Sequence, residues 1–184
     1  GDRVTLVLVG PGSATVFFPA GEDVDLQRLE LTGTTAASAM YILTAGRTTL
    51  TDVDINGALT SFYGPKVDLL GDFSASASVG LLNLGDIAAQ HVVSIGPAES
   101  QRTTATILLG HLEDVTMDVL TPIRYLSVAA WADTDGTRDS LTAPRIDVLI
   151  SRGDFVPDMT LTGPAGLLPT LGTAIVYGDL TGAW

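Results

Sequence analysis

Residues 67–87 read VDLLGDFSASASVGLLNLGDI, and this stretch decides the fold. One short run of β-forming residues ends at Gly71-Asp72, and a second run ends at Gly85-Asp86. Glycine supplies the positive φ that a tight corner needs, and aspartate favours turns. The same alternation of a β run and a glycine corner returns along the chain, with further corners at Asn56-Gly57, Gly153-Asp154 and Gly178-Asp179.

Comparable β runs cover much of the chain, at residues 26–33, 49–57, 67–73, 80–87, 91–96, 112–119, 123–128, 145–155, 158–163 and 173–182. Their apolar residues alternate, as in Val53-x-Ile55 and Met159-x-Leu161, which places them on one face of a strand. Corresponding units return at roughly 20–25 residues, a spacing typical of solenoids. We therefore predict an all-β fold, a right-handed parallel β-helix whose inward Val, Leu and Ile side chains form ladders.

An antiparallel β-sandwich is the competing fold, because it is also built from short strands and frequent turns. The β-helix is favoured because the units resemble one another, which sandwich strands have no reason to do. No Ser- or Pro-rich linker divides the chain, so we expect residues 1–184 to form a single parallel β-helix domain, excised from a larger repeat protein. Residues 97–105 and 131–144 interrupt the repeat, and Phe17-Phe18 is expected to cover the open N-terminal end.

The composition excludes several classes of partner. The chain has 184 residues, 16% of them charged, and a formal net charge of −12. Such a surface repels nucleic acid and anionic lipid, and it attracts divalent cations. The apolar runs, such as residues 128–132, are too short for membrane insertion, which takes about 20 residues. There is no cysteine, which excludes disulfides and thiolate metal sites.

Two stretches carry a resemblance to a known class of protein. Residues 67–87 and residues 123–163, which read IRYLSVAAWADTDGTRDSLTAPRIDVLISRGDFVPDMTLTG, resemble the repeats of large secreted or surface proteins of bacteria, particularly planctomycete-type ones. The resemblance covers residues 26–182 and fits residues 97–121 least well. It implies a parallel β-helix that is secreted or displayed at the cell surface. It further implies a structural or adhesive role, with neighbouring repeats, a cell-surface polymer or a protein as partners.

The stretch WADTDGTRDS, residues 131–140, is the candidate metal loop. Its carboxylates Asp133, Asp135 and Asp139, with Gly136 for a sharp turn, have the residue types of a calcium site. The spacing departs from the EF-hand, where glycine stands sixth and a glutamate twelfth. An Asx-turn, in which the aspartates cap backbone amides, is the alternative. Arg138 inside the loop is a competing cation for these aspartates.

No catalytic site is predicted. The chain has no Gly-x-Ser-x-Gly, His-Glu-x-x-His or P-loop motif, and His91 and His111 fit ordinary corner positions. The corner residues Asp72, Asp86, Asp154 and Asp179 are expected to stack as a ladder that caps turns. We therefore predict a non-enzymatic extracellular structural or adhesive module, stabilised by calcium. The alternative is a calcium-dependent carbohydrate-binding or polysaccharide-cleaving β-helix, which would need a basic residue near the metal, where Arg138 and Arg145 flank the loop.

Overall fold

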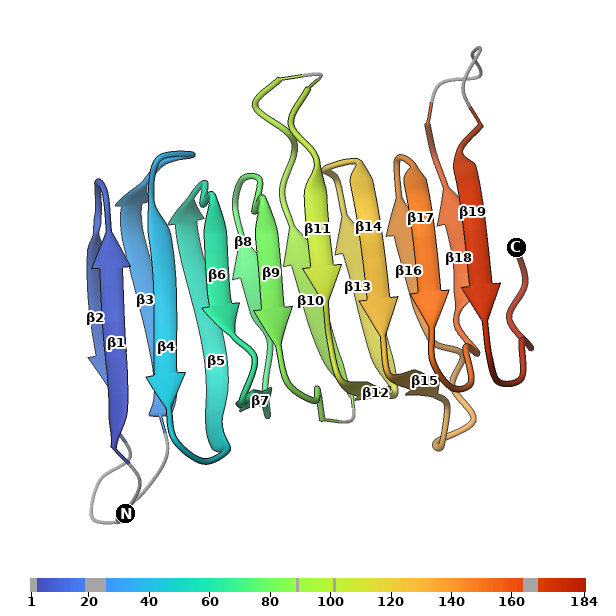
Figure 1. Ribbon diagram of the computed structural model, residues 1–184, viewed down its shortest axis with the longest axis horizontal. Helices are drawn as coiled ribbons and strands as arrows, with labels where there is room; N and C mark the ends of the chain where they lie inside the picture. Colours follow the sequence, from blue (N-terminus) through green and yellow to red (C-terminus); the bar gives the residue numbers. More distant parts are fainter. Residues whose placement is uncertain (1–2, 19–25, 89, 101, 164–168) are drawn as a thin grey trace.

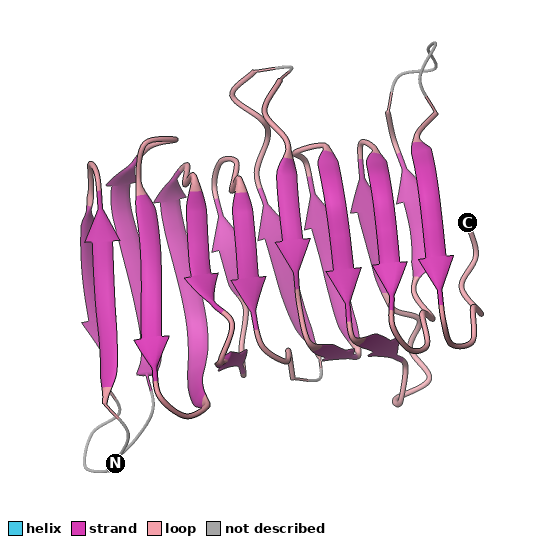
Figure 2. Ribbon diagram, viewed as in Figure 1, coloured by secondary structure: helices cyan, strands magenta, loops and turns pink. Residues whose placement is uncertain are grey.

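The computed structural model of the chain describes residues 3–18, 26–88, 90–100, 102–163 and 169–184. These residues contain nineteen β-strands and no helix (Figure 2). Accordingly, they include no helix that is long and apolar enough to cross a membrane. The strands stack into a β-solenoid of about six turns, which confirms the predicted fold class over the sandwich.

Two long sheets form opposite sides of the solenoid. Sheet A has eight strands, in the order β1 (Val4–Val9), β4 (Ala39–Thr44), β6 (Ser61–Gly64), β9 (Leu81–Leu84), β11 (Ala105–Leu108), β14 (Ile123–Val128), β17 (Ile146–Ser151) and β19 (Leu171–Val176). The main path of sheet B follows the order β2 (Ser13–Phe17), β3 (Leu26–Thr34), β5 (Thr48–Gly57), β8 (Phe73–Ala75), β10 (His91–Ile95), β13 (Val115–Val119), β16 (Ser140–Ala143) and β18 (Asp158–Leu161).

The solenoid is parallel and right-handed. From β3 onward, neighbouring strands within each sheet run in the same direction. In Figure 1 the chain advances from left to right, and the strands of sheet A run downward in front while those of sheet B run upward behind. This sense of winding is right-handed, as the sequence predicts.

A third, short face joins sheet A to sheet B at the lower side of Figure 1. It contains β7 (Val67–Leu69), β12 (His111–Glu113) and β15 (Ala130–Ala132), together with isolated β-bridges. One inward column runs through this face from coil to coil and comprises Leu69, Ile87, Leu112, Trp131, Phe155 and Leu180. The candidate metal loop leaves the solenoid at the end of this face.

The core is a set of apolar ladders, because alternate strand residues point inward and stack on the equivalent residue of the next coil. In sheet A the fully buried ladder comprises Met40, Phe62, Leu82, Ile107, Leu126 and Leu149. Phe62 meets Phe73 of sheet B edge to face, with ring centroids 5.3 Å apart. The predicted inward ladders are therefore confirmed.

The N-terminal end is closed by two antiparallel strands. Strand β1 pairs antiparallel with β4, and β2 pairs antiparallel with β3. Leu6, Leu8 and Val16 pack against the core from these strands. Phe17 and Phe18 do not cover the end with their rings, because they are 41% and 64% exposed. Inward and outward positions alternate along β2, so Val16 takes the inward position beside Phe17.

The segment at residues 97–105 does not disturb the stack. Residue 101 lies outside the described residues, and the others connect β10 to the start of β11. Strand β11 nevertheless pairs parallel with both β9 and β14, and β13 pairs parallel with β10. The poorly fitting part of the repeat therefore keeps its parallel pairing, and its register against β14 shifts once, between Ala105 and Thr106.

Candidate functional site: an aspartate loop and the carboxylate ladders

The loop at residues 133–139 connects β15 to β16 as a pair of capped turns. The Asp133 Oδ1 atom accepts the Gly136 N–H at 2.9 Å, and the Asp135 Oδ1 atom accepts the Thr137 N–H at 2.6 Å. Gly136 has a φ of 76°, a left-handed conformation that glycine adopts without strain. The Asx-turn interpretation of this loop is therefore correct.

The turn brings Asp133 and Asp135 together with Asp114, an aspartate of the preceding coil. One carboxylate oxygen from each of the three residues lies within 4.8 Å of the others. Asp133 and Asp135 are exposed, and Asp114 is buried. Carboxylate oxygens at this separation can hold a metal ion.

Asp114 is held in place from two sides. Its φ of 49° turns the chain between β12 and β13. Its Oδ1 accepts the Thr134 N–H at 2.6 Å, and its Oδ2 accepts the Thr134 hydroxyl at 2.8 Å. These bonds hold the pKa of Asp114 below its ordinary value, and the bond from the Thr134 N–H has the largest effect. Asp114 therefore stays ionised at neutral pH.

Asp139, the third predicted ligand, does not belong to this cluster. Its residue is only 4% exposed, and its Oδ2 accepts the Trp131 indole N–H at 2.9 Å. Burial raises the pKa of Asp139 to about 7, and the nearby charges of Asp114 and Asp133 add to the rise. A buried indole N–H needs an acceptor, and Asp139 supplies it.

Arg138, the arginine inside the loop, does not pair with the aspartate cluster. Its Nη1 lies 2.9 Å from Asp158 Oδ1, on the next strand of sheet B. Gln90 also contacts the cluster, with its Nε2 3.4 Å from Asp135 Oδ2. The predicted competition from Arg138 is therefore absent, because the arginine pairs outside the loop.

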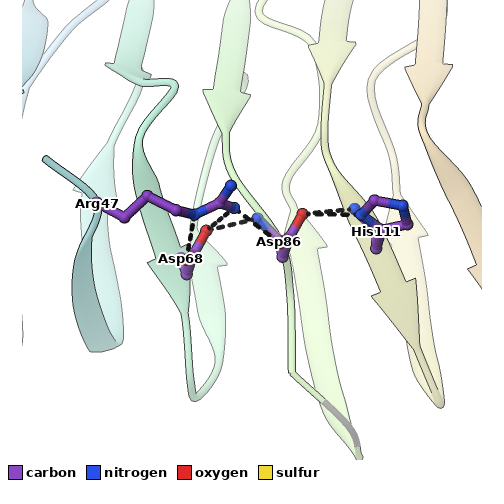
Figure 3. Close-up of polar contacts among 4 residues, drawn as sticks. All are labelled: Arg47, Asp68, Asp86 and His111. Carbon is purple, nitrogen blue, oxygen red and sulfur yellow. Dashed lines mark hydrogen bonds and ion pairs between the residues drawn. The ribbon is translucent and has the colours of Figure 1, made fainter.

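A second group of carboxylates stacks at the corner between sheet A and the third face (Figure 3). The Asp68 Oδ1 atom accepts the backbone N–H of Asp86 at 2.9 Å, and the Asp86 Oδ1 atom accepts that of His111 at 2.8 Å. Arg47 bridges the two carboxylates, with its Nη2 2.6 Å from Asp68 and 2.7 Å from Asp86. Each carboxylate thus caps an amide of the following coil.

The same contact recurs at other coils and at the corner between the third face and sheet B. Further pairs of a carboxylate and the backbone N–H that it accepts are Asp154 with Asp179, Asp52 with Asp72, Asp72 with Val92, and Asp158 with Ala183. Asp72 therefore stands on a different corner from Asp86, Asp154 and Asp179. The predicted turn-capping role is confirmed for Asp72, Asp86 and Asp154, and Asp179 takes part as a donor through its backbone N–H. The single predicted ladder is in fact two, one at each corner.

The glycine of the Gly-Asp corners has a different purpose from the one predicted. Among the five predicted corners only Gly57 has a positive φ, at 142°. At Gly71, Gly85 and Gly178 an added Cβ would overlap the carboxylate oxygen contributed by the coil before. Glycine is therefore needed at these three corners because the coil before comes too close for a Cβ. At Gly85 the carboxylate is the closest obstacle, and at Gly71 and Gly178 the backbone of the coil before is one as well.

We predict that the glycine and the carboxylate are energetically coupled. Gly85→Ala should destabilise the chain by about 1–3 kcal/mol, because its Cβ would overlap Asp68 Oδ1. Asp68→Ala alone should cost about 0.5–2 kcal/mol, as the loss of a cap does. In the double variant the costs should fall short of their sum by about 1 kcal/mol. Urea unfolding of the four chains measures this, and additive costs would contradict it.

The raised pKa of Asp139 predicts a pH-dependent stability. The fold favours the neutral acid, so its contribution is complete below the ordinary pKa of about 3.9 and is lost as pH rises through 7. Asp139→Asn should match the native chain at pH 4 and exceed its unfolding free energy at pH 8. We expect a gain on the order of 1 kcal/mol, after discounting for solvent screening. Urea titrations in EDTA measure it, and parallel pH profiles would exclude it.

No protein-family model, no curated protein and no solved structure matches this chain. A solenoid by itself does not specify an activity, so function has to come from the geometry of the site. That geometry consists of a capped turn, three carboxylates that can hold a metal ion, and two ladders that tie the coils together.

Proposed function

We propose that this chain is a non-enzymatic structural and adhesive module that acts outside the cell or on its surface. The observation that carries the proposal is the use of the corner carboxylates. Asp52, Asp68, Asp72, Asp86 and Asp154 all accept a backbone N–H of the next coil. A carboxylate used in this way holds the scaffold together, and it is poorly placed for acid–base chemistry.

The two basic residues that flank the loop support a non-catalytic module as well. Arg138 pairs with Asp158, and the Arg145 Nε lies 2.7 Å from Asp147 Oδ1. A polysaccharide lyase on this fold would need one of them free to abstract a proton. A polysaccharide-binding site remains the second candidate, because a hollow of about 200 Å³ lies beside the cluster, lined in part by Asp135 and Thr137.

We further propose that Asp114, Asp133 and Asp135 hold a metal ion and that this ion is calcium. Calcium takes oxygen ligands in flexible geometry from carboxylates and water, and an exposed turn provides both. The turn hydrogen bonds use Oδ1 of Asp133 and Oδ1 of Asp135, which leaves the second oxygen of each carboxylate facing an ion. On Asp135 an ion would share that oxygen with the long contact from Gln90 Nε2. The net charge of −12 favours a divalent cation over an anionic ligand.

Calcium should therefore stabilise the native chain. An ion bound only by the folded state adds RT ln(1 + [L]/Kd), or about 2.7 kcal/mol at a hundred times Kd. We expect millimolar calcium to raise the thermal midpoint over that in EDTA, and Asp135→Asn to abolish the rise. The asparagine keeps an oxygen for the Thr137 N–H. Asp118→Asn, which alters an exposed carboxylate on β13, is the matched control. An equal rise in both variants would assign calcium to the general surface charge.

One assay can distinguish binding of a polysaccharide by this chain from its cleavage. The chain should sediment with an insoluble neutral polysaccharide, chitin or cellulose, and should release no new reducing ends from it. Polygalacturonate, a polyanion, should be bound less because the chain is itself acidic. Co-sedimentation and a reducing-end assay are run with calcium and with EDTA. New reducing ends would favour the polysaccharide-cleaving alternative, and no binding to any polymer would reject adhesion to carbohydrate.

A further inference from the structure

The outer face of sheet A carries two rows of uncharged side chains that the strand register aligns. The first row, in which Asn83 and Ser127 are the polar members, also contains Val7, Tyr41, Tyr63, Leu108, Ile150 and Ile175. The second row includes Val9, Leu81, Tyr125 and Val148, and its polar members are Ser61, Thr106 and Thr173. We call these two rows the apolar face.

These side chains point away from the core. On the same strands they alternate with Met40, Phe62 and Ile107, which are fully buried inside. No described element crosses in front of sheet A (Figure 1). Val7 and Ile175, at the two ends of the first row, are 38% and 40% exposed, and the members between them are half-buried by their neighbours. The apolar face is therefore uncovered in the single chain.

The outer face of sheet B has the opposite character. Its central row is polar throughout and comprises Thr15, Glu30, Asp54, Ser74, Ser94, Asp118, Thr142 and Thr160. Outward positions of the two sheets meet the same backbone requirements, so the solenoid fold does not account for this difference. Large uncovered apolar patches on a soluble protein mark interaction surfaces.

We propose that the apolar face binds the apolar face of a second copy of this chain, sheet against sheet. The dimer gives the proposed interaction module a specific partner, a second copy of the chain. The dimer proposal rests on the proposed function only in that it treats the solenoid as an interaction module. Eight strands at about 4.8 Å, with two rows of side chains that each take about 6.8 Å along a strand, give a footprint of about 500 Å². Two such faces together give about 1,000 Å², the total area at which specific interfaces begin.

The distribution of charge favours a copy of the chain over an ionic partner. The two rows of the apolar face carry no charge, and Arg124 and Asp147 stand in the row beside them. At the other edge of the face, Asn83, Leu108 and Ser127 line a hollow together with Arg47, Asp86 and Arg152. In a face-to-face pair the two acidic sheet B surfaces lie about 30 Å apart, three times the spacing of packed sheets. That exceeds the Debye length of about 8 Å at physiological salt but equals the length of about 30 Å at 0.01 M. Association should therefore tighten as salt is raised.

Sedimentation equilibrium of the full chain in EDTA tests the pair without involving calcium. We expect dimers in 0.15 M salt over about 1–100 µM, and weaker association at 0.01 M salt. Leu108→Lys should weaken the association at least tenfold, because it buries an unpaired charge. Ser94→Lys adds the same charge to the opposite sheet of the same coil and should leave the dimer intact.

A second pair of variants adds no charge to the chain. The chain has no cysteine, so Thr106→Cys and Ser94→Cys each accept a single spin label, on opposite faces of one coil. The distance between labels in the dimer should be shorter for Thr106 than for Ser94. Circular dichroism checks that every variant is folded.

Two results would contradict the proposed dimer. One is a chain that stays monomeric to about 100 µM at both low and high salt. The other is an equal loss of association in Leu108→Lys and Ser94→Lys, which would place the contact elsewhere. Either result leaves the polysaccharide assay unaffected, so failure of the dimer can be told from failure of the proposed function.

Discussion

The contact on which the rest of the structure depends is the hydrogen bond from a backbone N–H of one coil to a carboxylate of the coil before. At the corners the sheets end and the coil must turn, so the ladder bonds of the sheets are interrupted there. A buried or half-buried amide without a partner is costly. The aspartate supplies that partner, and the glycine of the next coil leaves room for its oxygen, as Gly85 does for Asp68. The coils can therefore stack closely while the chain turns at each of these corners.

The candidate metal site follows from this stacking. Because equivalent corners superpose, a loop in one coil lies over the aspartate of the coil before, and Thr134 meets Asp114 across 20 residues of sequence. Trp131 occupies the inward column of the third face, where its indole N–H has to be satisfied in the core, and Asp139 is drawn inward to do so. The loop is left with Asp133 and Asp135 at the surface, and Asp114 completes the group of three.

The fold was more predictable from the sequence than the site was. The β runs, the Gly-Asp corners and the inward alternation are local patterns, and together they indicate a right-handed solenoid. The cluster depends on which residues superpose between coils, and the spacing of equivalent corners varies from 18 to 25 residues. Asp114 therefore carries no local signal as a ligand, and a fixed period would misplace it. The antiparallel closing strands were missed because β1 and β2 carry the same β pattern as the parallel coils.

The contrast between the two sheets says more about function than the shared core does. Inward residues are fixed by packing, and the corner residues by capping, so outward residues are where a solenoid is free to differ. Sheet B uses that freedom for hydroxyl and carboxyl groups, which are favoured in contact with water. Sheet A places Tyr41, Tyr63 and Tyr125 in aligned rows with aliphatic residues, at positions that core packing does not prescribe. An apolar face that folding does not require has its physical reason in something that covers it.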